Sequence, residues 1–507
     1  MAGTAMPLWL KLVPFGSVCI FLFFISHIEN RQALFPGEFV STGARVRAYQ
    51  WALNTELWLN SSPPMKPFHF LQCAGPAAAM LFLLGGTVPV PAAATDGVTL
   101  AFDKKAGCYR VDFDLTAVTH REAGRQYAAA IRGEFPKFEA LTDRFLQETI
   151  DDVNKGIADP ARRMTFAKAL AAANALRKNI PRDYREEIDG MGLVFSWPVD
   201  KLGDGHLSAN ENFVSLIFED VTQAAACSAA AVFGRGSATG RTIVGRNNDW
   251  PPNEEMDSWN TMFVFHNGDR SSAGNGMIGE LFPNNVFNRH HLFGGSLDSW
   301  PSSEPSVPRH GARSPTIDLR WVIENSRTLA GAEKALTRRD YGTGSLILLA
   351  DADTAHVLEY DTSRPAGQRG KLRSATTKLR DGITWDLPDA IASVNSFLLP
   401  GAFPNHVDDP HNRLRLESFR KLLRRDFSEG PVNLSLMKDI MGYTSRDGCA
   451  ATSGALFRLG IGNDSATFQS LVMRMDTFET WMAYSAYGAK WPYRPVYHKI
   501  FAGSPFR

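Results

Sequence analysis

The spacing of apolar residues divides the chain into a helical part and a later part rich in short strands. Residues 121–187 carry apolar side chains three and four positions apart, which predicts helices, with Pro136, Pro160 and Pro181 as breaks. From Cys227 onward, short apolar runs alternate with turn residues, which predicts strands. These runs are SAAAVFGRG, RTIVGRN, MFVFHN, SLILLAD, AHVLEYD, IASVNSF and SLVMRMDTFETWMAYS.

Two further helical stretches lie inside the strand series, at residues 317–336 and 413–423. Strand pairs, then helices, then more strand pairs predict sheets covered by helices, which is an α+β layered fold class. The sequence contains no internal repeat.

Composition narrows the classes of function. The chain has 507 residues, which is long enough for a large core. Lys and Arg number 54 against 53 Asp and Glu, and the resulting formal net charge of +1 is not basic enough to indicate a nucleic-acid-binding face. The composition therefore predicts a soluble enzyme or binding protein with no nucleic-acid partner.

Two apolar stretches near the N-terminus are typical of targeting segments. Residues 65–94 combine a basic start, an apolar centre and an Ala-x-Ala pattern ending at Ala94, which predicts a signal peptide. We expect Met65 to be the initiator, residues 1–64 to be an upstream extension, and the protein to be periplasmic or secreted. The alternative is a membrane anchor at residues 7–25, an apolar stretch interrupted by Lys11 and two prolines.

If the chain starts at Met65 and residues 65–94 are then removed, the mature chain keeps three cysteines. These are Cys108, Cys227 and Cys449. Exported chains commonly oxidise their thiols in pairs, so an odd number leaves one thiol unpaired.

Cys227 is the best candidate for a chemically active thiol. It lies where a helical segment gives way to a strand, and three alanines, residues 224–226, precede it. Small neighbours suit a cysteine that attacks its own preceding carbonyl in a strained turn. Cleavage between Ala226 and Cys227 would give Cys227 a free α-amine of pKa about 8, which is low enough to act as a general base.

The segment Gly-Arg-Asn-Asn-Asp, residues 245–249, is expected on the hairpin partner of the strand that Cys227 begins. A turn near residues 235–240 returns the chain to the cysteine. Arg246 would then lower the thiol pKa, and Asp249 would hold the α-ammonium group. Taken alone, Arg-x-x-Asp is better explained as a surface ion pair beside a turn.

Taken with the cysteine, these segments resemble the cysteine branch of the N-terminal-nucleophile (Ntn) hydrolases. That group includes choloylglycine hydrolases, penicillin V acylases, acid ceramidase and the acyl-coenzyme A:isopenicillin N acyltransferases, and the resemblance is closest to the last. Cys227-Ser228 and residues 245–249 match the family's opening strand and its Gly-Arg-Asn-x-Asp turn. Segments DYREEIDGMGLVF, SPTIDLRWVIENSRTLAGAEKAL, SLILLADADTAHVLEYD, IASVNSF and SLVMRMDTFETWMAY follow in the family's order and extend the likeness over residues 120–500.

The resemblance implies a four-layer αββα sandwich with a helical pro segment at residues 95–226 and a catalytic segment at residues 227–507. It implies that Cys227 is the nucleophile and, through its amine, the base, with Arg246 and Asp249 as its family partners. Asn395 matches the asparagine that donates to the tetrahedral oxyanion, a contribution of about 3 kcal/mol to transition-state stabilisation. No cofactor or metal is implied.

Two family positions lack a clean counterpart. For the second oxyanion asparagine we select Asn288, with Asn284 and Asn285 as competitors. For the late arginine we select Arg413, although the serine expected three residues before it is Pro410. The stretch from Cys227 to Arg246 is also a few residues longer than in bile salt hydrolases.

If Cys227 is the reactive thiol, Cys108 and Cys449 remain. By analogy with acid ceramidase they would form a disulfide that links the two fragments of a self-cleaved heterodimer; two buried thiols without a bond are the alternative. The predicted function is hydrolysis of a linear acyl amide, with the membrane reached only through the N-terminal segment. Acyl transfer onto an amine, or a catalytically silent binding protein, stays open.

Other residues have simpler explanations. His290, His291, His310, His406 and His411 lack the spacing of a zinc site and fit exposed loops. Four tryptophans would either line an acyl pocket or pack in the core, and these are Trp250, Trp259, Trp300 and Trp321.

Overall fold

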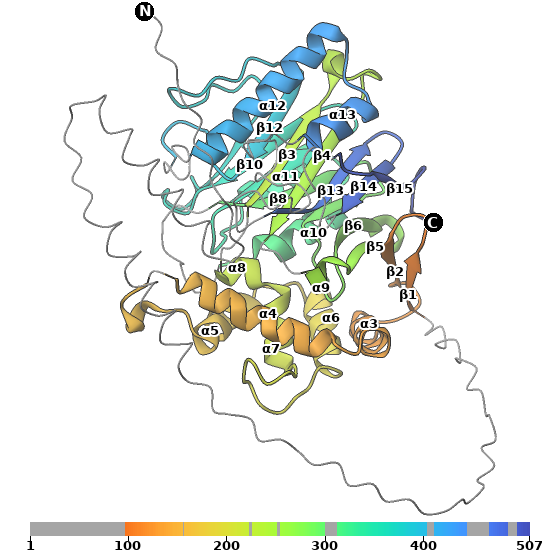
Figure 1. Cartoon of the computed structure of the whole chain (residues 1–507), viewed down its shortest axis with the longest axis vertical. Helices are drawn as coiled ribbons and strands as arrows, with labels where there is room; N and C mark the ends of the chain where they lie inside the picture. The colour runs from red at the N-terminus through yellow and green to blue at the C-terminus, as the bar shows by residue number, and fades with distance from the viewer. Residues whose placement is uncertain are drawn as a thin grey trace, which may run out of the picture. The chain divides into compact units, whose positions relative to one another are not determined.

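The computed structural model describes residues 97–155, 157–222, 226–250, 254–299, 312–402, 410–443, 466–484 and 494–507. These residues form an α+β fold with two β-sheets and covering helices, which confirms the predicted fold class (Figure 1). The two apolar N-terminal stretches lie outside the described residues, so their targeting roles stay predictions. Of the helices that the structure describes, none has both the length and the apolarity that a bilayer crossing requires.

The first sheet has nine strands within the described part of the chain. Their order in space is β1 (Val98–Asp103), β2 (Cys108–Asp114), β5 (Asn260–His266), β6 (Ser272–Met277), β7 (Asn285–Asn288), β8 (Phe293–Asp298), β9 (Ser345–Ala350), β10 (Ala355–Tyr360) and β11 (Gly370–Arg373). All neighbours are antiparallel except β2 and β5, which run parallel with Tyr109 opposite Thr261. The hairpin that precedes the helical segment is therefore part of the same sheet as later strands.

The second sheet has six antiparallel strands among the described residues. Their order is β12 (Ala390–Val394), β3 (Ala226–Val232), β4 (Ile243–Trp250), β13 (Ala466–Arg474), β14 (Glu479–Tyr484) and β15 (His498–Phe501). β3 and β4 form the predicted hairpin, with Cys227 opposite Asn248 and Ala229 opposite Arg246. Because β3 lies between β12 and β4, both of its neighbours fix its position.

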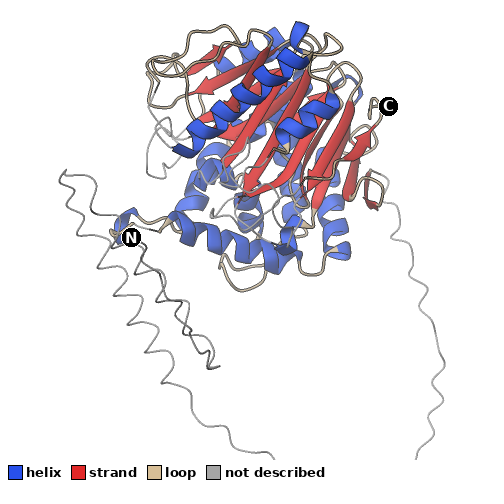
Figure 2. Cartoon of the chain, turned by 45° about the horizontal axis from the view of Figure 1, so that its top comes forward, coloured by secondary structure: helices blue, strands red, loops and turns tan. Residues whose placement is uncertain are grey.

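The two sheets pack face to face through one apolar core. Alternate residues of each strand enter it, including Ala229 and Ala231 of β3, Val264 of β5 and Leu348 of β9. The opposite face of the six-stranded sheet is covered by α12 (Pro410–Glu429) and α13 (Leu434–Met441). The opposite face of the nine-stranded sheet, at β7 to β10, is covered by α10 (Pro315–Asn325) and α11 (Leu329–Thr337). Figure 2 shows helices against the strands on both sides.

The helical segment before Cys227 covers the remaining part of the nine-stranded sheet. It comprises α3 (His120–Glu134), α4 (Phe138–Val153), the short 3-10 helix at Pro160–Arg162, α5 (Phe166–Arg177), α6 (Arg182–Gly192), α7 (Ala209–Leu216) and α8 (Phe218–Thr222). Its core contains Tyr127 of α3 with Phe113 of β2 and Phe263 of β5. This segment and the later strands therefore share one hydrophobic core.

Local sequence signals explain where the helices begin and end. Pro136 lies between α3 and α4, and Pro181 precedes α6, as the sequence predicted. The helical stretch expected at residues 317–336 is two helices, because the Thr328 side chain caps α11 and restarts the chain there. The Ser208 side chain likewise forms a capping box with Glu211 at the start of α7.

Helices α3 and α6 cross at a distance that glycine makes possible. A Cβ atom on Gly124 would lie 2.0 Å from the Glu187 carbonyl oxygen, and one on Gly190 would lie 2.0 Å from that of Arg121. Any larger residue would force the two helices apart. The close crossing places Glu187 of α6 at the centre of a buried ion network.

That network joins the helical segment to the strands and helices after Cys227. Arg320 of α10 donates to both carboxylate oxygens of Glu187, at 2.6 and 3.1 Å, and to Glu324 at 2.7 Å. Arg320 and Glu187 have no exposed side-chain surface, and the guanidinium carbon lies 3.6 Å from the centre of the Phe265 ring. Tyr184 completes the network by donating to Glu324 at 2.7 Å.

We expect Arg320→Met to lower the free energy of unfolding by about 3–5 kcal/mol, because it removes the cation that the buried carboxylates of Glu187 and Glu324 share. Urea denaturation, followed by tryptophan fluorescence, measures this change. Arg182→Met removes an exposed arginine whose partner is Glu186 and is expected to change stability little. Equal effects of the two substitutions would contradict the assignment of the network as the link between the segments.

Candidate active site

Cys227 begins β3 with both of its backbone polar groups held by side chains. Its N–H donates to Asn395 Oδ1 at 2.7 Å, and its carbonyl oxygen accepts from Arg415 Nη1 at 2.9 Å. The side chain faces the core between the sheets and is 5% exposed. The scissile position predicted from the sequence, between Ala226 and Cys227, therefore lies beside a fixed set of polar groups.

Burial dominates the electrostatics of the Cys227 thiol. It raises the thiol pKa to about 11. The Arg246 guanidinium opposes this shift, whereas the charges of Asp249 and Asp298 add to it. In the intact chain the thiol is consequently protonated at neutral pH, and it has to lose its proton to a base when it attacks a carbonyl.

Arg246 is buried on β4 and is fixed by backbone carbonyls. Its Nε and Nη2 atoms donate to the carbonyl oxygen of Ser296, the first at 3.1 Å, and Nη1 donates to that of Asn247. Its charge acts on the thiol and on the carboxyl groups of Glu219 and Asp298. Arg246 therefore lies where the sequence predicted, as a fixed positive charge near the sulfur.

Asp249 ends the same strand and lies opposite Ala226 in the β3–β4 ladder. Its Oδ1 accepts from the hydroxyl of Thr467 on β13. Its Oδ2 lies 3.5 Å from Arg415 Nη1, and both side chains are almost completely buried. This carboxylate is thus held between a strand and α12, next to the residue whose carbonyl carbon would be attacked.

Asn395 follows β12 and connects three parts of the site. Its Oδ1 accepts from the Cys227 N–H and from Arg415 Nη2, the latter at 2.8 Å. Its Nδ2 donates to the Asp298 carbonyl oxygen at 2.8 Å. In the intact chain the side-chain oxygen therefore faces the nitrogen that would become the α-amine after cleavage.

Arg415, and not Arg413, is the arginine that contacts the backbone of Cys227 and the side chain of Asn395. Arg415 is 1% exposed and also donates to Asn412 Oδ1, whereas Arg413 has half of its side chain in solvent. The sequence held a signal for this difference. Along α12 the buried positions include Leu416, Phe419 and Leu423, and Arg415 precedes Phe419 by four residues on the same face.

Asn288 lies in a different environment from the one expected of an oxyanion donor. Its Nδ2 donates to the carbonyl oxygens of Ile323 and Ser326, at 2.6 and 2.8 Å, and its Oδ1 accepts two backbone N–H groups of the following turn. These bonds close the C-terminal end of α10. Asn284, a competitor in the sequence, instead lines the cavity at Cys227 and donates to Glu219 at 2.7 Å.

A narrow cavity of about 70 Å³ reaches the thiol. Its polar lining includes Cys227, Asn248 and Asp249 from the β3–β4 hairpin, and Glu219 from α8. Half of the apolar wall comes from the helical segment, through Phe138, Phe145, Leu216 and Phe218. The other half comes from the part after Cys227, through Met256, Met277, Ile278 and Phe468. The segment before the predicted cleavage position therefore forms part of the cavity at the nucleophile.

Four carboxyl groups lie in or beside this cavity: Asp220 is buried, and Glu219, Glu280 and Asp298 are half-buried. Burial, with a smaller contribution from the charge of Glu219, raises the pKa of Asp220 to about 7 and that of Glu280 to about 8. Burial and the neighbouring carboxylates hold the pKa of Asp298 well above its usual range. Arg246 is the cation whose charge acts on Glu219 and Asp298.

The remaining candidates are placed as follows. Trp259 packs between the rings of Phe135 and Phe138, and the Arg339 guanidinium lies over Trp321. The side chains of Trp250, Trp300, His310, His406 and His411 lie outside the described residues, as does Cys449. Cys108 is buried, and its proposed pairing with Cys449 stays a prediction. Within the described ranges, no group of three or more His, Cys, Asp or Glu side chains is arranged to hold a metal ion.

Comparison with known proteins gives a distant structural likeness. No family model matches the chain, and no curated protein sequence matches it. Among solved structures, an N-acylethanolamine-hydrolyzing acid amidase ortholog from Caenorhabditis elegans is 15% identical, with a TM-score of 0.33, covering 49% of this chain and 92% of that one. A variant of the conjugated bile acid hydrolase from Clostridium perfringens is 12% identical, with a TM-score of 0.33, covering 54% and 92%.

Penicillin V acylase from Agrobacterium tumefaciens is 14% identical, with a TM-score of 0.32, and the match covers 51% of this chain and 83% of that one. At these values the likenesses do not establish a family. The chemistry of the site therefore rests on its own geometry.

The carboxyl groups at this cavity predict a loss of stability as the pH rises. A carboxyl group whose pKa is raised in the folded state binds more protons there than in the unfolded state, so stability falls between the unfolded and folded pKa values. For Glu280 this interval runs from its ordinary value of 4.5 to about 8. We expect the melting temperature of the Cys227→Ala chain to fall from pH 5 to pH 8, and to fall less in the same chain with Glu280→Gln.

The matched control is Glu148→Gln, which removes an exposed carboxylate of α4 and is expected to leave the pH dependence unchanged. Scanning calorimetry at several pH values measures all three chains. An unaltered slope in the Glu280→Gln chain would show that Glu280 is ionised in the folded protein.

Proposed function

We propose that the chain is a self-processing amidohydrolase of the N-terminal-nucleophile type, with Cys227 as its nucleophile. The observation that carries this proposal is the position of Cys227 at the start of a strand, with its N–H on Asn395 and its carbonyl oxygen on Arg415. Buried Arg246 and Asp249 lie on the adjacent strand. A structural cysteine has no need of this surrounding set of charges.

In the self-processing step, the Cys227 sulfur attacks the carbonyl carbon of Ala226, and the bond from that carbon to the Cys227 nitrogen breaks. The thiol proton passes to this nitrogen, which becomes a primary amine. Water then hydrolyses the thioester, which releases Ala226 as a carboxylate and restores the thiol. Asn395 Oδ1 already accepts from the nitrogen that leaves, so it would hold the new amine in place.

The same atoms would then cleave an external acyl amide. The α-amine takes the thiol proton, the sulfur attacks the acyl carbonyl carbon, and the proton passes to the departing amine. Water hydrolyses the resulting thioester to a carboxylate. Arg246 supplies positive charge near the sulfur, Asp249 stabilises the α-ammonium group, and Asn395 Nδ2 can turn from the Asp298 carbonyl to the oxyanion.

Water and an amine are alternative acceptors of the same thioacyl group. We favour water because the predicted signal peptide would take the chain to a compartment without acyl-coenzyme A. Transfer onto an amine is the second candidate function, and a panel of acyl amides with and without an added amine separates the two. The four-layer αββα order of an Ntn hydrolase is consistent with helices on the outer faces of two packed sheets.

The fragments of the cleaved chain are proposed to stay together as a heterodimer without further help. β2, from the first fragment, pairs with β5 of the second, and the Glu187–Arg320 ion pair joins the same two parts. A disulfide between Cys108 and Cys449 would add a covalent link in an exported protein.

Self-cleavage is directly testable on protein expressed from Met65. We expect two bands on a denaturing gel, the larger beginning Cys227-Ser228-Ala229 by N-terminal sequencing, because the thiol has only its own peptide bond to attack in the precursor. Cys227→Ala should give one band. A wild-type chain that stays intact on prolonged incubation would favour the catalytically silent binding protein.

Asn395→Ala is expected to lower the rate of amide hydrolysis by the cleaved protein by roughly 10²–10³, because an oxyanion donor and the holder of the amine are lost together. Turnover of an acyl amide selected from a panel, per cleaved chain, is the measurement. Asn325→Ala is the matched control, since that exposed side chain donates to the Trp321 carbonyl oxygen at the end of α10 and does not line the cavity at Cys227. A rate within a few-fold of wild type for Asn395→Ala would remove it from the catalytic set.

A further inference from the structure

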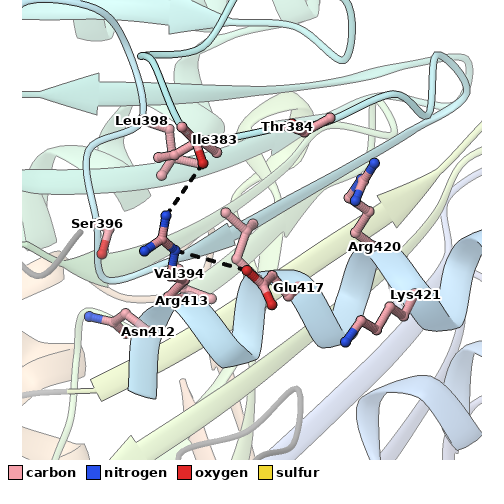
Figure 3. Close-up of a pocket in the computed structure, with 12 residues that line it drawn as sticks. Ile383, Thr384, Val394, Ser396, Leu398, Asn412, Arg413, Glu417, Arg420 and Lys421 are labelled. Atoms are coloured by element: carbon pink, nitrogen blue, oxygen red, sulfur yellow. Dashed lines mark hydrogen bonds and ion pairs between the residues drawn. The ribbon is translucent and has the colours of Figure 1, made fainter. Parts of the chain in front are cut away.

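A second and larger cavity lies away from the thiol. It has a volume of about 260 Å³ and lies between α12, the residues after β12 and the loop at residues 382–384 (Figure 3). Val394 and Leu416, which line it, belong to the core under α12, whereas Cys227 belongs to the core between the sheets. The two cavities share no lining residue and lie on opposite faces of the six-stranded sheet.

The lining of this cavity carries positive charge that the described residues neutralise only in part. Arg413 lies 3.4 Å from the Gly382 carbonyl oxygen and 3.9 Å from Glu417, both at the outer limit of such contacts. Lys421 has no ion pair or hydrogen bond within the described part of the chain. Arg420, in contrast, is held by two hydrogen bonds to Asp386. Arg413 and Lys421 therefore contribute two positive charges to the lining, and Glu417 contributes one negative charge.

The wall of the cavity contains a buried hydroxyl group that also lacks a protein partner. Ser396 is 2% exposed, and its Oγ atom makes no hydrogen bond to any residue that the structure describes. Figure 3 shows Ser396, Asn412 and Arg413 at one end of the cavity, with Arg420 and Lys421 further along the helix. A buried hydroxyl without a partner is unfavourable unless a ligand or water supplies one.

Part of the lining is apolar. Ile383, Val394, Leu398 and Leu416 contribute apolar side chains to it. An anion without a hydrocarbon part would leave these side chains uncovered, and a neutral hydrocarbon would leave Arg413 and Ser396 unsatisfied. The lining therefore matches a molecule with one carboxylate and one aliphatic chain.

We propose that this cavity is a binding site for an aliphatic monocarboxylate. The carboxylate accepts hydrogen bonds from Arg413 and from the Ser396 hydroxyl, and the chain lies on Val394, Leu398 and Leu416 toward Lys421. This ligand is of the same chemical class as the acid that hydrolysis of an acyl amide would release, a point that rests on the proposed function. The binding itself does not depend on that function.

The site is also connected to Arg415, which positions Cys227 and Asn395. Asn412 lines the cavity at its Ser396 end, and its Oδ1 accepts from Arg415 Nη2. The same guanidinium contacts the Cys227 carbonyl oxygen and Asn395. A carboxylate bound at this end would therefore lie one side chain away from the group that holds the nucleophile.

Isothermal titration of octanoate into the intact Cys227→Ala chain tests the proposal without any need for catalysis. We expect saturable binding that weakens by about tenfold or more in the same chain with Arg413→Glu, because the carboxylate loses its main charged donor. Arg424→Glu makes the same charge change on the same helix outside the cavity lining and is expected to leave octanoate affinity unchanged. Ser396→Ala should weaken binding less than Arg413→Glu.

Octanamide provides the matched ligand, since it keeps the aliphatic chain and loses the negative charge. We expect its affinity to be lower than that of octanoate by a factor of about ten or more. Octanoate binding that survives Arg413→Glu would belong to another site, such as the cavity at Cys227, and would overturn the proposal. Equal affinities for octanamide and octanoate would do the same. Because Cys227→Ala removes the nucleophile in every sample, failure of the proposed function leaves these results interpretable.

Discussion

The geometry of the candidate active site depends on one buried guanidinium. Arg415 contacts the Cys227 carbonyl oxygen of β3, Asp249 of β4, Asn395 directly after β12, and Asn412 of its own helix. A buried cation is stable only when such partners surround it. Each partner is therefore held in place by the same charge, and the start of β3 is held with them.

The charges around the nucleophile are unevenly balanced. Arg246 and Arg415 are the buried cations, while Asp249, Glu219, Glu280, Asp220 and Asp298 supply carboxyl groups within or beside the cavity. Burial of so many carboxyl groups keeps several of them protonated near neutral pH. The thiol shares this environment, so its proton affinity in the precursor is coupled to the state of its neighbours.

The sequence predicted those parts of the site that lie on one hairpin. Cys227, Arg246 and Asp249 are brought together by a short turn, so their proximity follows from local pairing alone. Asn288 and Arg413 illustrate the limit of such reasoning. Which of several nearby asparagines reaches a cavity depends on strand register, and which of two arginines is buried depends on helix phase.

The sequence likewise predicted those parts of the fold that depend on local signals, but not a strand pairing between distant segments. Pro136 and Pro181 mark helix breaks correctly, because a proline acts on its immediate neighbours, whereas the cap at Thr328 was missed. The membership of the β1–β2 hairpin in the nine-stranded sheet was not predicted. Its parallel pairing with β5 joins segments well over a hundred residues apart and has no local sequence signal.

That parallel pairing bears on what self-cleavage would accomplish. The part of the chain before Cys227 supplies strands β1 and β2 of the nine-stranded sheet, the Glu187 side of a buried ion pair, and Phe138, Phe145 and Glu219 of the cavity wall. Its departure would expose the shared apolar core and leave Arg320 without Glu187, both at a large cost in free energy. Cleavage before Cys227 would therefore free the α-amine without removing the wall of the cavity. The part of the chain before Cys227 would then act as a lasting subunit and not as a discarded propeptide.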